Sequence, residues 1–94
     1  MIMANYAYPI DPSWSVTEMD TVIRFLNTIE AAYETGVAKD KILTNYKAFK
    51  RVIPSKMEEK QIGREFAKVS AYEIYPTVKL AQESDKKTIH MSAK

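Results

Sequence analysis

The sequence predicts an all-α fold, a small antiparallel bundle of three to four helices with an extended aromatic arm at its N-terminus. Apolar residues recur at intervals of three and four over several long stretches, which is the spacing of a helix face. Gly36, Pro54 and Pro76 fall near the ends of these stretches, and no Asn-Gly or Asp-Gly pair marks a hairpin. The short links between stretches favour antiparallel neighbours. We therefore expect a single domain over residues 1–84.

The arm comprises residues 1–14 and is rich in aromatic side chains. Tyr6, Tyr8 and Trp14 make it too apolar for a free tail, so we expect it to lie across the helices in extended form. The first helix should then span about residues 16–35. Residues at its two ends indicate where this helix starts and stops, and the spacing of its apolar residues indicates its inner face.

Ser15 is a suitable N-cap for the first helix, because its hydroxyl can accept a hydrogen bond from a free backbone N–H. Glu18 stands three residues on, which completes the spacing of a capping box. Gly36 supplies the left-handed residue that commonly ends a helix. The expected apolar face comprises Met19, Val22, Ile23, Leu26, Ile29 and Tyr33.

The second helix should span about residues 38–52 and the third about residues 56–70. Pro54 ends the second helix, since the residue before a proline disfavours the helical conformation. Ser55 and Glu58 repeat the capping-box spacing at the start of the third. The expected apolar faces are Ile42, Leu43, Tyr46, Phe49 and Ile53, and Ile62, Phe66 and Val69.

The fourth helix should span about residues 74–83. In the third helix, Gly63 costs about 1 kcal/mol relative to alanine, which suggests a close approach of another helix. The apolar face of the fourth helix comprises Ile74, Tyr75, Val78 and Ala81. Residues 85–94 are polar and without periodicity, so we expect a disordered tail in which His90 has no particular role.

The composition excludes several functional classes. The absence of Cys excludes disulfides, thiolate nucleophiles and Cys-ligated metals, and a single His argues against two-His metal motifs and a Ser-His-Asp triad. We expect no cofactor, no metal site and no catalytic residues. No basic segment precedes an apolar run near the N-terminus, and no stretch is long enough to span a bilayer. We therefore expect a cytoplasmic protein that has no membrane partner.

Several stretches occur together in a characteristic order. They are Tyr8–Asp11 with Trp14–Ser15, Glu30–Glu34 with Gly36–Val37, Tyr46–Lys56, and Glu58–Gln61 with Glu65–Phe66. Over about residues 5–83 the chain resembles the uncharacterised protein family 0223, small helical cytoplasmic proteins of low-GC Gram-positive bacteria. Ala38 departs from the capping Asp that the family often carries, so the second helix would start less firmly or at Lys39. The resemblance implies a helical fold and no activity, because the family has no assigned function, ligand or catalytic residues.

Charge is unevenly distributed along the chain, although the formal net charge is only +2. Residues 1–38 carry five acids and one base, residues 39–68 carry nine bases and four acids, and residues 69–94 have a net charge of +1. Four bases stand four residues apart and should form one stripe on the third helix. The candidate binding face is Lys47, Lys50, Arg51, Lys56, Lys60, Arg64 and Lys68. The alternative is that the stripe is only the solvated side of a bundle helix.

Glu30 falls inside the apolar arc of the first helix. It is either a boundary residue paired with Arg64, a Lys or a Tyr hydroxyl, or a functional group for proton transfer or ligand binding. We expect it to have a hydrogen-bond partner within the chain. The six Tyr and the single Trp have two interpretations as well. They form an exposed patch that marks an interface, or they close a small core with their hydroxyls at the rim.

We expect a non-catalytic protein-interaction or regulatory module that binds a protein partner or a second copy of itself as a homodimer. The alternative is a nucleic-acid-associated protein that uses the basic face. Phe66 lies on the other side of the third helix, which weakens this alternative. Nucleic-acid binding would weaken steeply with salt, whereas an apolar protein interface would not. An enzyme would need a concave pocket lined by Glu30 and tyrosines.

Overall fold

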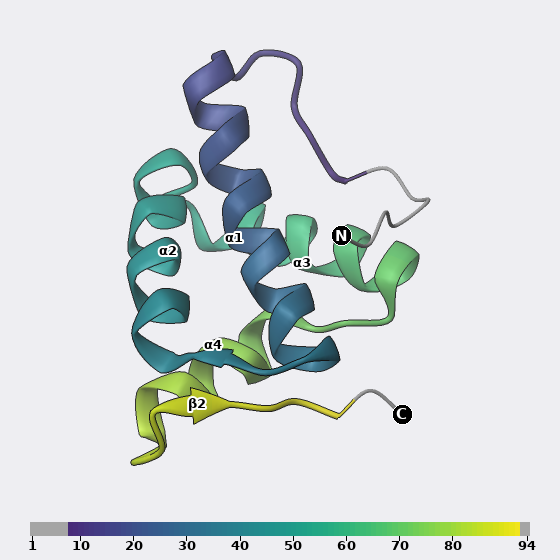
Figure 1. Ribbon diagram of the computed structural model, residues 1–94. Helices are drawn as coiled ribbons and strands as arrows, with labels where there is room; N and C mark the ends of the chain where they lie inside the picture. The colour runs from purple at the N-terminus through teal and green to yellow at the C-terminus, as the bar shows by residue number, and fades with distance from the viewer. Residues whose placement is uncertain (1–7, 93–94) are drawn as a thin grey trace.

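The computed structural model describes residues 8–92, which form four α-helices and a two-stranded sheet (Figure 1). In chain order the elements are α1 Val16–Glu34, β1 Val37–Ala38, α2 Lys39–Val52, α3 Lys56–Ser70, α4 Ile74–Glu83 and β2 Thr88–Ile89. The small helical fold is confirmed, and each helix begins and ends within one residue of the expected position. Tyr6 and the rest of residues 1–7 lie outside the described residues.

The helix ends follow the capping chemistry of the sequence. The Ser15 N–H donates to Glu18 Oε1 at 2.8 Å, and the Glu18 N–H donates to Ser15 Oγ at 3.1 Å, so the capping box is present. At α2, Ala38 offers no side-chain cap and the helix begins at Lys39. The Lys39 N–H donates instead to the Lys87 carbonyl oxygen at 2.8 Å. The chain beyond α4 therefore supplies a hydrogen-bond acceptor for one free backbone N–H at a helix start that has no side-chain cap.

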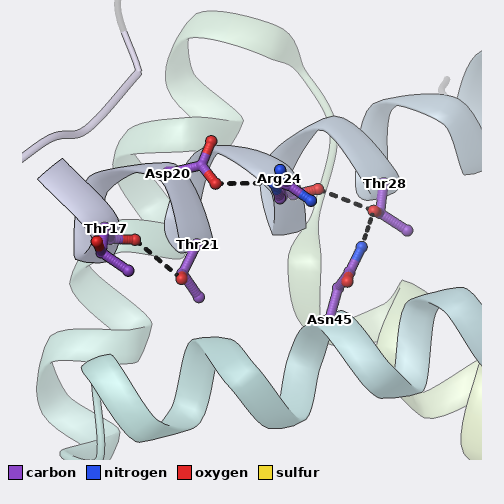
Figure 2. A network of polar contacts seen from close by, with 6 residues as sticks. All are labelled: Thr17, Asp20, Thr21, Arg24, Thr28 and Asn45. Atoms are coloured by element: carbon purple, nitrogen blue, oxygen red, sulfur yellow. Dashed lines mark hydrogen bonds and ion pairs between the residues drawn. The ribbon is translucent and has the colours of Figure 1, made fainter.

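Helices α1 and α2 lie side by side and run in opposite directions (Figure 1). Phe25 of α1 stacks on Phe49 of α2 with ring centroids 4.6 Å apart. Between the same helices, Asn45 Nδ2 donates to Thr28 Oγ1 at 2.7 Å, and Thr28 Oγ1 donates to the Arg24 carbonyl oxygen at 2.8 Å (Figure 2). Phe25 and Thr28 were missing from the expected apolar face. They are buried because α1 packs against α2, α4 and β1, so its buried arc is wider than a single stripe.

In Figure 1, α3 passes behind α1 and extends to the side away from α2, and α4 packs against α2, α1 and α3. Ile62 and Phe66 are the buried residues of α3. Two residues expected on apolar faces are exposed instead: Val69 by 41% and Tyr75 by 64%. These expectations were wrong because only a narrow side of α3 meets other helices, and because α4 turns Thr77 rather than Tyr75 inward.

Gly63 does not mark the tight helix contact that the sequence suggested. A Cβ added at Gly63 would lie 4.0 Å from Ile74 Cδ1, which is ordinary van der Waals contact. An alanine would therefore fit at this position without displacing α4. The expected glycine conformation is found at Gly36, where φ is +90° after the end of α1.

The expectation of a disordered tail was wrong for residues 85–92. Strand β2 pairs antiparallel with β1, with Val37 opposite Ile89, and Ile89 is only 2% exposed. The Met91 N–H donates to the Ala32 carbonyl oxygen at 2.7 Å. The strands are two residues long, which is too short for a recognisable alternation of polar and apolar residues. They form only because two segments distant in sequence pair with each other. Ile89 of the tail is therefore part of the core, and Met91 packs against it.

His90 also has a structural position that the sequence did not reveal. Its imidazole lies against Gly36, where an added Cβ would come within 2.4–2.9 Å of three ring atoms. The absence of a side chain at this position therefore makes room for the ring, in addition to allowing the positive φ.

Candidate functional site

An open groove of about 770 Å³ lies between α3 and α4. All four residues of the stripe predicted on α3 line it. The lining on the α4 side comes from the start of that helix, and Tyr46 of α2 completes it. The lining residues are Tyr46, Lys56, Glu59, Lys60, Gly63, Arg64, Ala67, Lys68, Glu73, Ile74, Tyr75 and Pro76.

The α3 stripe, defined as Lys56, Lys60, Arg64 and Lys68, is exposed along its whole length. Within residues 8–92 none of the four side chains makes a hydrogen bond or an ion pair. Cations four apart on a helix repel one another, and Lys56 stands in the first turn, where the helix dipole disfavours positive charge. The stripe therefore leaves positive charge uncompensated along one wall of the groove.

The rest of the predicted binding face is not part of this groove. Lys50 Nζ forms an ion pair with Glu59 Oε1 at 2.6 Å, and both side chains are mostly buried. Lys47 and Arg51 are exposed on α2 but do not line the groove. The structure thus brings together four of the seven predicted residues and assigns Lys50 to an internal contact.

Glu59 is held by two neighbours at the edge of the groove. Besides the ion pair with Lys50, it accepts a hydrogen bond from the Tyr46 hydroxyl at 2.9 Å. Burial, followed by this bond to Glu59, raises the pKa of Tyr46 to about 12, so the hydroxyl remains a donor at neutral pH. Because its charge is paired with Lys50, Glu59 does not neutralise the stripe.

Tyr75 was not among the predicted binding residues, although the alternative of an exposed tyrosine patch included it. It projects from the start of α4 into the groove lining and is 64% exposed. Within residues 8–92 its hydroxyl has no hydrogen-bond partner. Local sequence signals do not place it beside the stripe, because its position in the same groove depends on how α4 packs against α3.

The other described tyrosines favour the interpretation of a closed core with hydroxyls at its rim. Tyr33 and Tyr72 stack with ring centroids 4.5 Å apart. The Tyr33 hydroxyl accepts a hydrogen bond from the Glu73 N–H at 3.2 Å, and the Tyr72 hydroxyl donates to Glu34 at 2.9 Å. These rings are partly buried and their polar ends are satisfied at the surface.

Glu30 has the tyrosine partner that was one of the expected alternatives. The Tyr8 hydroxyl lies 3.0 and 3.1 Å from the two Glu30 carboxylate oxygens and 2.8 Å from Asn27 Oδ1. Burial, followed by the charge of Glu34, raises the pKa of Glu30 to about 7. Glu30 lines neither the groove nor the smaller cavity under the arm. Its contacts hold the described part of the arm against α1.

A smaller cavity of about 140 Å³ lies on the arm side of α3. Its lining includes Trp14 and three carboxylates, those of Asp11, Glu58 and Glu65. Helix α3 therefore has an acidic side that faces the arm and a basic side that faces the groove.

Within residues 8–92 no group of three or more His, Asp or Glu side chains is arranged to hold a metal ion. No helix in this part of the chain has the length and apolar character needed to cross a membrane.

The fold and the groove of residues 8–92 define a small four-helix domain in which one helix presents a row of cations, unpaired among these residues, beside an open cavity. The chain belongs to the Uncharacterised protein family (UPF0223), which matches residues 5–90. The match includes β2, which the sequence resemblance had left outside. The name of the family assigns no activity.

Relatives in streptococci and lactococci are similar over nearly their whole length. A UPF0223 protein of Streptococcus agalactiae serotype III (strain NEM316) is 51% identical over 86 residues, which are 92% of each chain. One of Streptococcus sanguinis (strain SK36) is 49% identical over 93% of this chain and 95% of its own. One of Lactococcus lactis subsp. lactis (strain IL1403) is 48% identical over 90% and 91%.

Proposed function

We propose that this chain is a non-catalytic protein-interaction module of the cytoplasm and that the groove between α3 and α4 is its docking surface. One observation carries the proposal. The α3 stripe is unpaired within residues 8–92, and it faces the exposed ring of Tyr75 across an open cavity. Exposed tyrosine and arginine are enriched at protein interfaces. A bound partner would also relieve the repulsion along α3.

Association with nucleic acid is the second candidate, and one feature of the groove favours it. Tyr75 supplies the aromatic ring near the cations that the sequence of α3 lacked, and a base could stack on such a ring. The positive charge of the groove is confined to the α3 stripe, because Lys47 and Arg51 lie outside the groove and do not extend it. This short positive surface favours a protein partner over a long run of phosphates.

Site-specific photo-crosslinking in the native cell tests the proposal. Benzoylphenylalanine replaces Tyr75 in one variant and Lys41 in another; Lys41 is exposed on α2 outside the groove. We expect protein adducts at position 75 that survive nuclease treatment and are absent at position 41. An adduct with the chain itself would identify a second copy as the partner. Adducts at position 75 that nuclease removes would replace the proposal with the nucleic-acid alternative, and equal adducts at both positions would contradict docking in the groove.

A further inference from the structure

We infer that the groove between α3 and α4 binds an acidic polypeptide segment that carries at least one apolar side chain. The inference rests on the proposed function and specifies the chemistry of the partner. It follows from the charge of one wall, the spacing of that charge and the nature of the opposite wall.

The charge of the groove is positive after internal pairing is taken into account. The lining holds the four cations of the α3 stripe and two carboxylates, Glu59 and Glu73. Lys50 lies outside the lining and pairs with Glu59, so four positive charges face one unpaired carboxylate. A segment with several carboxylates would complement this wall.

The spacing of the cations sets the spacing of the carboxylates. Residues four apart on a helix are displaced by about 6 Å along its axis, so the stripe from Lys56 to Lys68 is about 18 Å long. Side chains on one side of an extended chain recur every about 6.6 Å. A segment of about seven extended residues, with four acids at alternate positions, would therefore match the full stripe.

The rest of the lining requires more than charge. Tyr75 and Pro76 are exposed at the start of α4, and Gly63 and Ala67 are half-buried on α3. Apart from the Tyr75 hydroxyl, these groups present an aromatic ring and aliphatic surface. An apolar side chain between two carboxylates would cover this surface, whereas a phosphate backbone would not.

The purified full-length chain and synthetic peptides test the inference by fluorescence anisotropy. The probe is fluorescein-labelled Ser-Glu-Leu-Glu-Ser-Glu-Leu-Glu, with two control peptides in which Lys replaces every Glu or Ser replaces both Leu. The site variant is K60E/R64E. The matched control is K47E/R51E, which makes the same charge change with the same residue types and spacing on α2, outside the groove.

We expect the probe to bind the wild type and the matched control alike, and to bind K60E/R64E about tenfold or more weakly. The Lys peptide should not bind, and the peptide without Leu should bind several-fold more weakly. Tyr75→Ala changes no charge at an exposed position and should also weaken binding several-fold. Circular dichroism melts of each variant verify that it is folded.

Equal losses in K60E/R64E and K47E/R51E would overturn the inference, because binding would then follow net charge alone. Absence of probe binding to the wild type would overturn it too, as would tighter binding of a single-stranded oligonucleotide of equal charge. If the peptide fails while position 75 still cross-links to a protein, the acidic-segment inference is wrong and the interaction function stands. If the peptide binds but position 75 cross-links to no protein in the cell, the interaction function itself is contradicted.

Discussion

The carboxylates that pack beside tyrosines and the cations of the α3 stripe are treated in opposite ways by this fold. Three carboxylates each accept a hydrogen bond from a tyrosine hydroxyl, whereas the stripe has no partner within residues 8–92. The pairs are Tyr8 with Glu30, Tyr72 with Glu34, and Tyr46 with Glu59. We infer that the tyrosine–carboxylate contacts stabilise the domain and that the stripe costs stability, which leaves its charge available to another molecule.

The largest expected effect on stability comes from the tyrosine–carboxylate contacts. Tyr46→Phe removes the donor to Glu59 and retains the ring, so it should lower the free energy of unfolding by about 2 kcal/mol, the value of a hydrogen bond to a charged group. Urea denaturation measures the change. Tyr75→Phe is the matched control and should change the free energy of unfolding by less than about 0.5 kcal/mol, because Tyr75 is exposed and its hydroxyl has no partner among the described residues. Equal effects of the two substitutions would contradict the comparison.

The next largest effect is a pH dependence of the stability, and it comes from Glu30. Burial first, and then the charge of Glu34, raises its pKa from 4.5 to about 7 in the folded chain. The folded state therefore holds this proton more tightly than the unfolded state. The resulting stabilisation is fully present below pH 4.5 and is lost as the pH rises through about 7.

Glu30→Gln should remove this part of the pH dependence. We expect the free energy of unfolding of the wild type to fall relative to the variant between pH 4.5 and 7.5 by about 1 kcal/mol, a value reduced for the solvent contact of this carboxyl. Urea titrations at several pH values measure the difference between the two proteins. Parallel pH profiles would show that Glu30 is titrated alike in the folded and unfolded states.

The helices could be predicted from the sequence because their signals are local. The capping box of Ser15 and Glu18, the glycine after α1 and the proline after α2 fix the helix ends through groups a few residues apart. Strand β2 could not be predicted, since Ile89 becomes buried only by pairing with Val37, which is distant in sequence. Local patterns carry no information about such pairings.

The site divides in the same way. The α3 stripe could be predicted because spacing on one helix determines which side chains share a face. The groove that it lines could not be predicted, since the groove depends on the packing of α4, which places Tyr75 near the stripe. The ion pair that removes Lys50 from the binding face could not be predicted either, because its partner Glu59 belongs to the next helix.

The smallest expected effect concerns the α3 stripe, where a substitution should raise rather than lower the free energy of unfolding. Arg64→Gln removes the repulsion between Arg64 and its two like-charged neighbours at i,i+4 spacing, Lys60 and Lys68. It should therefore raise the free energy of unfolding by about 0.5 kcal/mol at low ionic strength. The gain should shrink in 1 M salt, where such charges are screened.

Arg24→Gln provides the matched control for Arg64→Gln. It removes an exposed ion pair with Asp20, 2.8 Å between Nε and Oδ2 (Figure 2), and should lower the free energy of unfolding by a few tenths of a kcal/mol. Thermal and urea unfolding of both variants at two salt concentrations measure the signs. Loss of stability in Arg64→Gln at low salt would mean that Arg64 makes a stabilising contact within the chain. A gain there, together with a loss in Arg24→Gln, is the result expected if the stripe is maintained for binding at a cost in stability.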